Sequence, residues 1–269
     1  MHPAPHPSRP SPRLSRRRRS PRHLLGLALA ALLLPLLPAA VVATTATPAQ
    51  ADGCYTWGRT LKQGATGSDV TQLQIRVAGW AGYDRGFAID GSYGPATRTA
   101  VTNFQRAYGL SADGVAGPQT FSKIYALQDN DCTPIHFAWS EVDDVCFGGF
   151  PAPVSGTSVA TVKSNLLQVM WRAEALRHRL GDHPLRVTSA YRSRACNDRV
   201  GGASNSNHLY GRAIDLVPAG GGVTMCKIIQ QGRYVAFRQL LGPGYPDHSD
   251  HIHLGIQSTK SWHASQCGI

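Results

Sequence analysis

The chain has 269 residues, with 27 Lys and Arg against 16 Asp and Glu, and a formal net charge of +11 at pH 7. Seven of the basic residues and none of the acidic ones lie in residues 1–51, so the remainder carries 20 against 16, a net charge of +4. The remainder has no basic helix and no strand of alternating basic and aromatic residues. This argues against nucleic acid as a partner and suits an anionic polymer.

Residues 1–51 have the three parts of a secretory signal peptide. Arg16–Arg19 form a basic start, an apolar stretch runs from Leu24 to Ala43, and Ala49-Gln50-Ala51 is a small-x-small cleavage site. The apolar stretch is long enough for an uncleaved membrane anchor, but two prolines within it and the cleavage site favour removal. We therefore predict a secreted protein without membrane attachment after cleavage. The sequence does not choose between the Sec and the twin-arginine export routes.

All six cysteines follow the predicted signal peptide. They are Cys54, Cys132, Cys146, Cys196, Cys226 and Cys267. An even number of cysteines in an exported chain predicts three disulfides. The alternative, a cysteine metal site, lacks any C-x-x-C pair. Six cysteines allow 15 pairings, and their spacing does not choose among these.

Residues 56–127 contain an internal near-repeat, in which the segment Asp90–Thr97 is echoed by Asp113–Thr120. Each copy predicts an Asp-Gly turn followed by a helix with proline at an early position. Apolar residues recur at helical spacing after the first copy, and an earlier helix is expected with Ser68 as its N-cap. This region is therefore expected to form a compact three-helix unit.

The repeat region resembles the peptidoglycan-binding domain found beside cell-wall hydrolases. The matching positions are Leu61, Gly64, Gly67, Val70, Leu73-Gln74, Asp90-Gly91, Tyr93-Gly94, Thr97, Ala100-Val101, Phe104-Gln105, Gly109-Leu110 and Asp113-Gly114. The resemblance implies that residues 52–130 form a wall-binding domain with peptidoglycan as its partner. It does not assign the contact residues.

The C-terminal part is expected to begin with a connector containing proline and glycine, residues 131–157, and to continue as a domain over residues 158–269. Apolar spacing predicts one long amphipathic helix, three short strands and a second helix before the last strand. The expected ranges are Val159–Leu180 for the first helix, Leu185–Ala190, Ala213–Val217 and Ile252–Ile256 for the strands, and about Met225–Leu241 for the second helix. Such a mixture predicts an α+β fold.

Histidines and carboxylates gather in two short segments of this domain. Strand alternation places His251 and His253 on one face, opposite apolar neighbours. Upstream, His208 lies seven residues before Asp215, and a buried carboxylate requires a partner. Catalytic zinc sites commonly use three nitrogen or oxygen ligands. The pattern therefore predicts a metal site.

The segment Ser206–Asp215 has the S-x-H-x-x-G-x-A-x-D signature of the zinc D-Ala-D-Ala carboxypeptidase family, and Asp250–His253 resembles its second signature. That family includes vancomycin-resistance dipeptidases and phage endolysins. The resemblance covers about residues 146–269 and implies a hedgehog/DD-peptidase-like α+β domain with a small antiparallel sheet. It also implies disulfides in sequential order, Cys54–Cys132, Cys146–Cys196 and Cys226–Cys267.

The same resemblance implies a role for each site residue. His208, Asp215 and His253 become the ligands of one Zn²⁺ per chain. Asp250 becomes the general base, although most relatives have Glu there, and His251 is expected to stabilise the developing oxyanion. Arg192 is expected to bind the C-terminal carboxylate of the substrate with its guanidinium group. Ser206 is expected to orient the substrate.

The predicted activity is zinc-dependent hydrolysis of a peptide bond in the peptidoglycan stem peptide, with removal of the C-terminal D-Ala from D-Ala-D-Ala. The alternatives are a peptidoglycan endopeptidase with the same zinc site and a non-catalytic wall-binding protein. G-x-S-x-G, S-x-x-K and H-E-x-x-H motifs are absent from the sequence. We expect a monomer associated with the cell wall, whose two domains work independently, so that deleting residues 52–130 spares cleavage of small soluble peptides.

Overall fold

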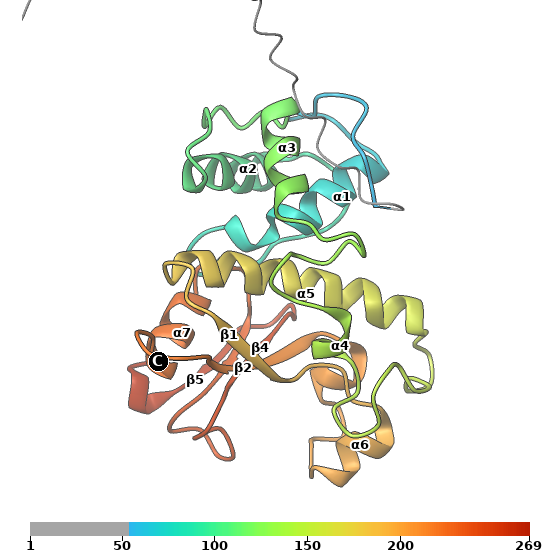
Figure 1. The fold of residues 1–269 in the computed structure, drawn as a ribbon, viewed down its shortest axis with the longest axis vertical. Helices are drawn as coiled ribbons and strands as arrows, with labels where there is room; N and C mark the ends of the chain where they lie inside the picture. The colour runs from blue at the N-terminus through green and yellow to red at the C-terminus, as the bar shows by residue number, and fades with distance from the viewer. Residues whose placement is uncertain (1–53) are drawn as a thin grey trace, which may run out of the picture. The chain divides into compact units, whose positions relative to one another are not determined.

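The computed structural model describes residues 54–269 (Figure 1), so the predicted signal peptide lies outside the described residues. Within this range no helix has the length and apolar character needed to cross a membrane. The three predicted N-terminal helices are present, and the first continues into a short 3-10 helix. They are α1 (Ser68–Val77), η1 (Ala78–Trp80), α2 (Pro95–Ala107) and α3 (Pro118–Ala126).

The internal repeat is a structural repeat in which a buried glutamine closes each Asp-Gly turn. Gln74 of α1 accepts hydrogen bonds from the backbone of Asp90 and Gly91 and donates to the Asp90 carboxylate. Gln105 of α2 does the same for the second turn, accepting from Gly114 N and donating to the Asp113 carboxylate. Each glutamine amide thereby ties the end of one helix to the turn that starts the next.

The starts of these helices follow the sequence prediction closely. Pro95 and Pro118 occupy early positions of α2 and α3, as predicted. The prediction of Ser68 as N-cap is wrong by one residue, because Gly67 is the N-cap and α1 begins at Ser68. Gly67 has φ 135°, a backbone conformation that favours glycine.

The C-terminal part is an α+β domain, as predicted. Its helices are α4 (Trp139–Val142), α5 (Val159–Arg179), α6 (Arg194–Arg199), η2 (Asn207–Tyr210), α7 (Met225–Gly232) and η3 (Ser265–Cys267). Its strands are β1 (Leu185–Ser189), β2 (Ala213–Pro218), β3 (Gln239–Leu241), β4 (Ile252–Gly255) and β5 (Ser261–His263). The sheet has the order β1-β2-β4-β3-β5, and all pairs are antiparallel except β3 with β5.

The predicted helix over residues 225–241 is wrong in its second half. Helix α7 ends at Gly232, and residues 239–241 form strand β3 beside β4. A side chain at position 232 would meet Leu240 and Leu254 at 3.2 Å, so Gly232 lets β3 and β4 pack closely against the helix end. Ala236, at φ 58°, lies in the segment that leads from the helix to the strand. Pairing with β4 therefore overrides the helical spacing of the apolar residues.

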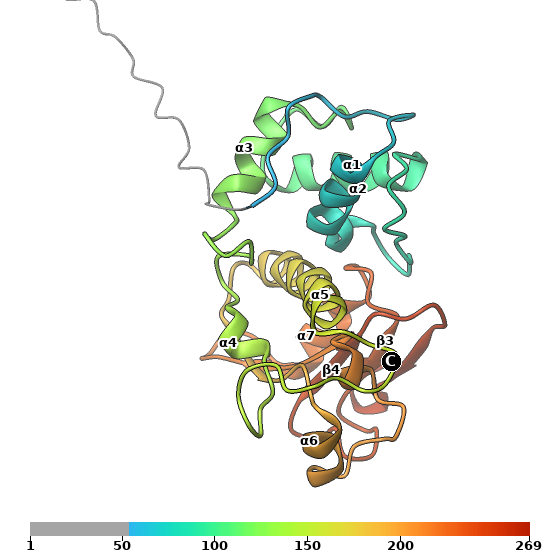
Figure 2. The same cartoon turned by 90° about the vertical axis from the view of Figure 1, so that its right-hand side faces the viewer.

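Helix α5 contacts both the N-terminal helices and the sheet (Figures 1 and 2). Its residues Trp171 and Ala175 belong to the same continuous hydrophobic core as Trp80 of η1 and Leu216 of β2. The packing therefore disfavours the independence of the two domains that was expected from the sequence.

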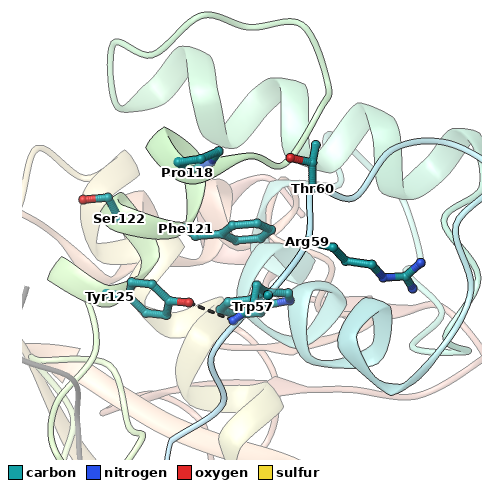
Figure 3. A pocket seen from close by; sticks show the side chains of 8 residues that line it. Trp57, Arg59, Thr60, Pro118, Phe121, Ser122 and Tyr125 are labelled. Carbon is teal, nitrogen blue, oxygen red and sulfur yellow. Dashed lines mark hydrogen bonds between the residues drawn. The ribbon is translucent and has the colours of Figure 1, made fainter.

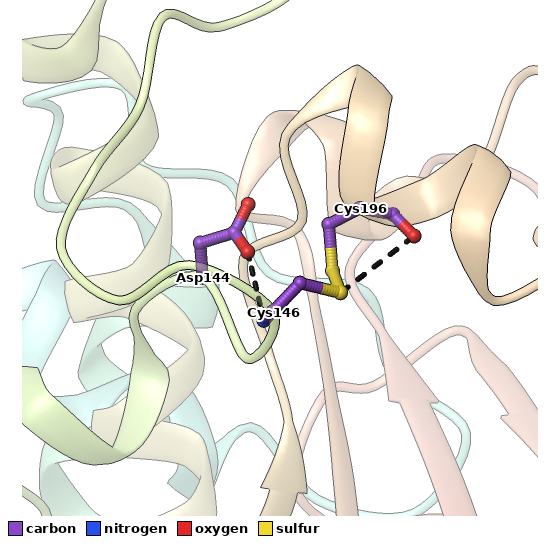
Figure 4. A group of neighbouring side chains, drawn as sticks. All are labelled: Asp144, Cys146 and Cys196. Atoms are coloured by element: carbon purple, nitrogen blue, oxygen red, sulfur yellow. Dashed lines mark hydrogen bonds between the residues drawn. A yellow bond between two sulfur atoms is a disulfide. The ribbon is translucent and has the colours of Figure 1, made fainter.

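The three disulfides have the sequential pairing that the family resemblance implied, Cys54–Cys132, Cys146–Cys196 and Cys226–Cys267. Asp144 lies beside the second of them (Figure 4). The group of Asp144, Cys146 and Cys196 is close enough to hold a metal ion. Both sulfurs are bonded to each other, however, so neither is available as the thiolate that a metal requires.

Asp144 instead holds the connector against the start of α6. Its carboxylate is 1 % exposed and accepts hydrogen bonds from the backbone N–H groups of Cys146, Phe147 and Ser193. Burial by itself raises the pKa of Asp144, but the hydrogen bonds from Ser193, Cys146 and Phe147 outweigh it and bring the pKa below its usual 3.8. The folded protein therefore favours the charged form.

We expect Asp144→Asn to destabilise the fold by about 1–3 kcal/mol at pH 7, because the amide NH₂ cannot accept a hydrogen bond from a backbone N–H. The folded pKa is depressed, so the stabilisation is present above the unfolded value of about 3.9 and is lost as the pH falls through the folded pKa. Urea unfolding at pH 7, 4 and 3 measures this. Asp198→Asn, at an exposed site, is the control. A difference in free energy that stays constant across these pH values would contradict the expected linkage.

Candidate metal centre

The histidine-glycine-aspartate motif folds as a short helix that leads into the central strand. Ser206 caps η2 by accepting a hydrogen bond from the backbone of His208. Gly211 ends the helix at φ 65°, and a Cβ there would lie 2.6 Å from the carbonyl oxygen of Val162 in α5. Asp215 follows in β2, directly opposite His253 of β4. The glycine of the motif therefore lets η2 pack on α5, and the strand register brings Asp215 to His253.

The three predicted ligands meet at one buried point. His208 Nε2 lies 3.2 Å and His253 Nδ1 lies 2.9 Å from Asp215 Oδ1, and the two nitrogens are 3.0 Å apart. Their exposed fractions are 2 % for His208, 2 % for Asp215 and 5 % for His253. No other described group of histidines and carboxylates converges in this way.

The chemistry of this donor set fits a zinc ion. His208 Nδ1 lies 2.5 Å from the backbone carbonyl of Ala190 and must donate to it, so Nε2 of the neutral ring presents a lone pair to the cluster. Two imidazoles and one carboxylate are a common catalytic zinc set, and a histidine ligand normally donates its other N–H to such an acceptor.

The protonation states also suit metal binding, which requires neutral histidine and ionised carboxylate. Burial, together with the neighbouring His208 and Arg192, lowers the pKa of His253 from its usual 6.5, although Asp215 raises it. Burial by itself raises the pKa of Asp215, but its interactions with His208 and His253 outweigh burial and hold the pKa well below 3.8.

Arg192 lies against this cluster. Its Nη2 is 2.6 Å from Asp215 Oδ2, and its Nε donates to Ser189 Oγ at 2.8 Å. The other carboxylate oxygen, Oδ1, faces the two histidines. The contact with Asp215 was not foreseen from the sequence, because nothing in the spacing of Arg192 indicated which carboxylate it would meet.

Asp250 and His251 form a pair at the edge of the cluster. Asp250 is exposed, and its Oδ1 lies 2.7 Å from His251 Nδ1. His251 Nε2 lies 3.9 Å from Asp215 Oδ1, so the imidazole stands between the Asp250 carboxylate and the ligand cluster. Hydrogen bonding to His251, the largest cause, brings the pKa of Asp250 below 3.8. His248 packs beside His251 with a ring distance of 4.8 Å.

A cleft of about 850 Å³ is lined by the three predicted ligands, by Arg192, His248 and His251, and by Ser206, Asn207 and Gln239, whereas Asp250 lies outside its lining. Its size falls within the range usual for ligand sites. Gln239 was missed from the sequence, because its strand was expected to be part of a helix. It lies 2.9 Å from His253 Nε2.

The helical part has a separate hollow of about 460 Å³ between residues 57–60 and α3 (Figure 3). Trp57 stacks on Phe121 at 4.8 Å, and the Tyr125 hydroxyl accepts a hydrogen bond from the Trp57 backbone. Arg59 is paired with Asp69 at 2.6 Å. These aromatic groups bind the N-terminal segment to α3, which explains their packing without a ligand.

Two histidines and one carboxylate buried together form a donor set that metal-dependent hydrolases use. The sequence matches the peptidase M15 family over residues 148–255 and a peptidoglycan binding domain family over residues 66–124. It is 47 % identical over 244 residues to the zinc D-Ala-D-Ala carboxypeptidase of Streptomyces albus G, covering 91 % of this chain and 94 % of the relative. The chain therefore belongs to the zinc D-Ala-D-Ala carboxypeptidase family.

Other similarities cover smaller shares of the chain. An N-acetylmuramoyl-L-alanine amidase of Mycobacterium tuberculosis is 42 % identical over 64 residues, 23 % of this chain and 14 % of the amidase. A Burkholderia AP3 phage endolysin structure is 30 % identical over 45 % of this chain and 38 % of its own, with a TM-score of 0.23.

Proposed function

We propose that this protein is a zinc carboxypeptidase that removes the C-terminal D-Ala from D-Ala-D-Ala ends of peptidoglycan stem peptides. The observation that supports this best is the convergence of His208, Asp215 and His253 at one buried point, in a chain 47 % identical to a carboxypeptidase of that name. His208 Nε2, His253 Nδ1 and an Asp215 oxygen would hold one Zn²⁺ per chain. Bound zinc would polarise the peptide carbonyl and lower the pKa of water to about 7.

We assign proton transfer and charge stabilisation to the pair at the edge of the cluster. Asp250 would accept the proton of the attacking water through the His251 imidazole that lies between them, and would return it to the leaving amine. His251 in its protonated form donates from both nitrogens. While Nδ1 contacts Asp250, Nε2 faces the cluster and could donate to the oxygen that becomes negatively charged.

We assign recognition of the substrate's terminal carboxylate to Arg192. Its guanidinium group has five N–H donors, and contacts to Ser189 and Asp215 engage Nε and Nη2. The Nη1 group would then donate to a carboxylate in the cleft. Ser206 lines the same cleft and would help to orient the peptide.

The products of a purified stem peptide test this function. Mass spectrometry is expected to find loss of one D-Ala from a pentapeptide ending in D-Ala-D-Ala, and no loss from the same peptide with a C-terminal amide. Internal cleavage would contradict the carboxypeptidase assignment and support the endopeptidase alternative. A zinc-loaded protein that cleaves neither peptide would support a non-catalytic wall-binding protein.

Asp250→Asn is expected to reduce turnover by about 10²- to 10⁴-fold, because it removes the proton acceptor. The zinc content is expected to stay near one per chain, since Asp250 is not among the three ligands. Metal analysis and the stem-peptide assay measure the two effects. Asp247→Asn, in the same cleft-lining loop, is the matched control. Turnover close to that of the unaltered protein would remove Asp250 as the base.

We further propose that the protein is secreted after removal of residues 1–51 and acts as a monomer at the cell wall. We also propose a wall-binding domain over residues 52–130, a connector over residues 131–157 and a catalytic domain over residues 158–269. The matched families, over residues 66–124 and 148–255, support this order.

A further inference from the structure

A line of hydrogen bonds connects the backbone carbonyl of Thr259 to His253. Gln257 Nε2 lies 2.7 Å from Thr259 O, and Gln257 Oε1 lies 3.1 Å from Asn207 Nδ2. Asn207 Nδ2 also lies 2.7 Å from Gln239 Oε1. Gln239 Oε1 in turn lies 2.9 Å from His253 Nε2. Three amide side chains therefore lie in series between a backbone group and the ring of a proposed zinc ligand.

The first link fixes the direction of the remaining ones. A carbonyl oxygen accepts hydrogen bonds and cannot donate, so the end of Gln257 at Thr259 must be the NH₂ group. Its oxygen then points at Asn207, which must present its own NH₂ group. That NH₂ group faces Gln239, which must present its oxygen. The orientation of all three amides follows from one backbone carbonyl, and no link is left ambiguous.

The hydrogen bond between Gln239 and His253 determines which ring nitrogen of His253 carries the proton. Because Gln239 presents an oxygen, His253 Nε2 must carry the hydrogen, and Nδ1 of the neutral ring is left with a lone pair. His253 Nδ1 is the nitrogen that faces His208 and Asp215. The line of amides therefore favours the tautomer that a metal ion requires at this position.

The pairing of β3 with β4 leaves space for the Gln239 side chain. In the sheet register Gln239 of β3 lies opposite Gly255 of β4. A Cβ on Gly255 would lie 2.7 Å from Gln239 Oε1 and 3.3 Å from Asn207 Nδ2, so this glycine leaves the space that the two amides occupy. Asn207 is the residue before His208 in η2. Helix η2 therefore carries the proposed ligand His208, and its Asn207 orients Gln239, which contacts the proposed ligand His253.

We propose that Gln239 is a positioning residue of the zinc site and that it holds His253 as the Nε2–H tautomer, itself oriented by Asn207 and Gln257. The proposal rests on the proposed zinc site. Without the Gln239 oxygen, the His253 ring is free to carry its proton on Nδ1. Zinc binding then requires that this proton first move to Nε2. Partners of this kind change metal affinity by about 10- to 100-fold.

Two substitutions of Gln239 separate positioning from packing. Leucine is similar in size to glutamine but has no hydrogen-bond acceptor. In Gln239→Leu, zinc affinity measured by competition with a chelator is therefore expected to fall about 10- to 100-fold. Gln239→Glu keeps an acceptor for both His253 and Asn207 and adds a negative charge, so its affinity is expected to be at least that of the unaltered protein. Gln266→Leu, at an exposed site, is the control. Equal losses in both Gln239 variants, or no loss in the leucine variant, would overturn the proposal.

Asn207→Asp gives the sharpest test, because it reverses the donor-to-acceptor direction of the hydrogen bonds from position 207 through Gln239 to His253. An aspartate cannot donate, so Gln239 is expected to turn its NH₂ group toward both neighbours and to move the proton of His253 to Nδ1. The added negative charge alone would attract Zn²⁺ and tighten binding. A proton on Nδ1 occupies the ligand atom of His253, so we expect weaker zinc binding instead. Binding that is equal or tighter, with unchanged ¹⁵N shifts of His253, would overturn it.

The ¹⁵N chemical shifts of His253 in the metal-free full chain report the tautomer without any need for turnover. We expect a protonated Nε2 in the unaltered protein and in Gln239→Glu, and a protonated Nδ1 in Asn207→Asp. A protonated Nδ1 in an unaltered protein that trims stem peptides would refute this inference alone. A protonated Nε2 in a protein that cleaves no stem peptide would refute the proposed function and leave this inference standing.

Discussion

His208→Ala is expected to remove zinc from the protein and to abolish hydrolysis of stem peptides. The substitution leaves His253 and Asp215 as the only members of the buried donor set. Loss of partners that merely support a ligand lowers metal affinity by about 10- to 100-fold, so loss of a direct ligand is expected to lower it by more than about 100-fold. Metal analysis after dialysis should fall from about one zinc per chain to a trace.

His183→Ala is the matched control, since it removes a histidine of the same domain that does not line the cleft. This variant is expected to retain both its zinc and its activity. Thermal unfolding of both variants without metal shows whether the fold is kept. A folded His208→Ala protein that retains stoichiometric zinc would show that the metal binds elsewhere, and the proposed mechanism would then lose its basis.

The convergence of His208, Asp215 and His253 could be predicted from the sequence because two short motifs carry these residues. The spacing from His208 to Asp215 contains the glycine that the turn between η2 and β2 requires. The alternation of His251 and His253 follows from strand geometry. These are local rules, and the strands β1, β2 and β4 were predicted by rules of the same kind.

The supporting residues could not be predicted, because their partners are distant in the sequence. Gln239 reaches His253 through the pairing of β3 with β4, and β3 was assigned to a helix on its apolar spacing alone. The contact of Arg192 with Asp215 joins residues 23 positions apart. Side-chain partners across a sheet depend on which strands pair and in which register, and neither could be worked out for a segment that was assigned to a helix.

The independence of the two domains was also inferred from the sequence, and the packing of η1 on α5 argues against it. A Cβ on Gly79 would lie 2.4 Å from the Ala175 side chain and 3.2 Å from the backbone of Arg172. Nearby, the Arg76 guanidinium lies 5.8 Å from the Trp171 ring. Removing residues 52–130 would expose this buried surface of α5 to water. We therefore expect the deletion to destabilise the catalytic domain, contrary to the sequence-based expectation.

Gly79→Ala tests this coupling with a single methyl group. The neighbouring atoms include backbone, which cannot move aside easily, so overpacking is expected to cost about 1–3 kcal/mol. For a chain of this size that corresponds to a fall in Tm of roughly 2–12 °C. Because the core is continuous across η1 and α5, wall binding and peptide hydrolysis are expected to be lost together in one thermal transition. Gly221→Ala, where a Cβ meets nothing within 4 Å, is the control. Two separate transitions in the unaltered protein, or an unchanged Tm in Gly79→Ala, would restore the view that the domains are independent.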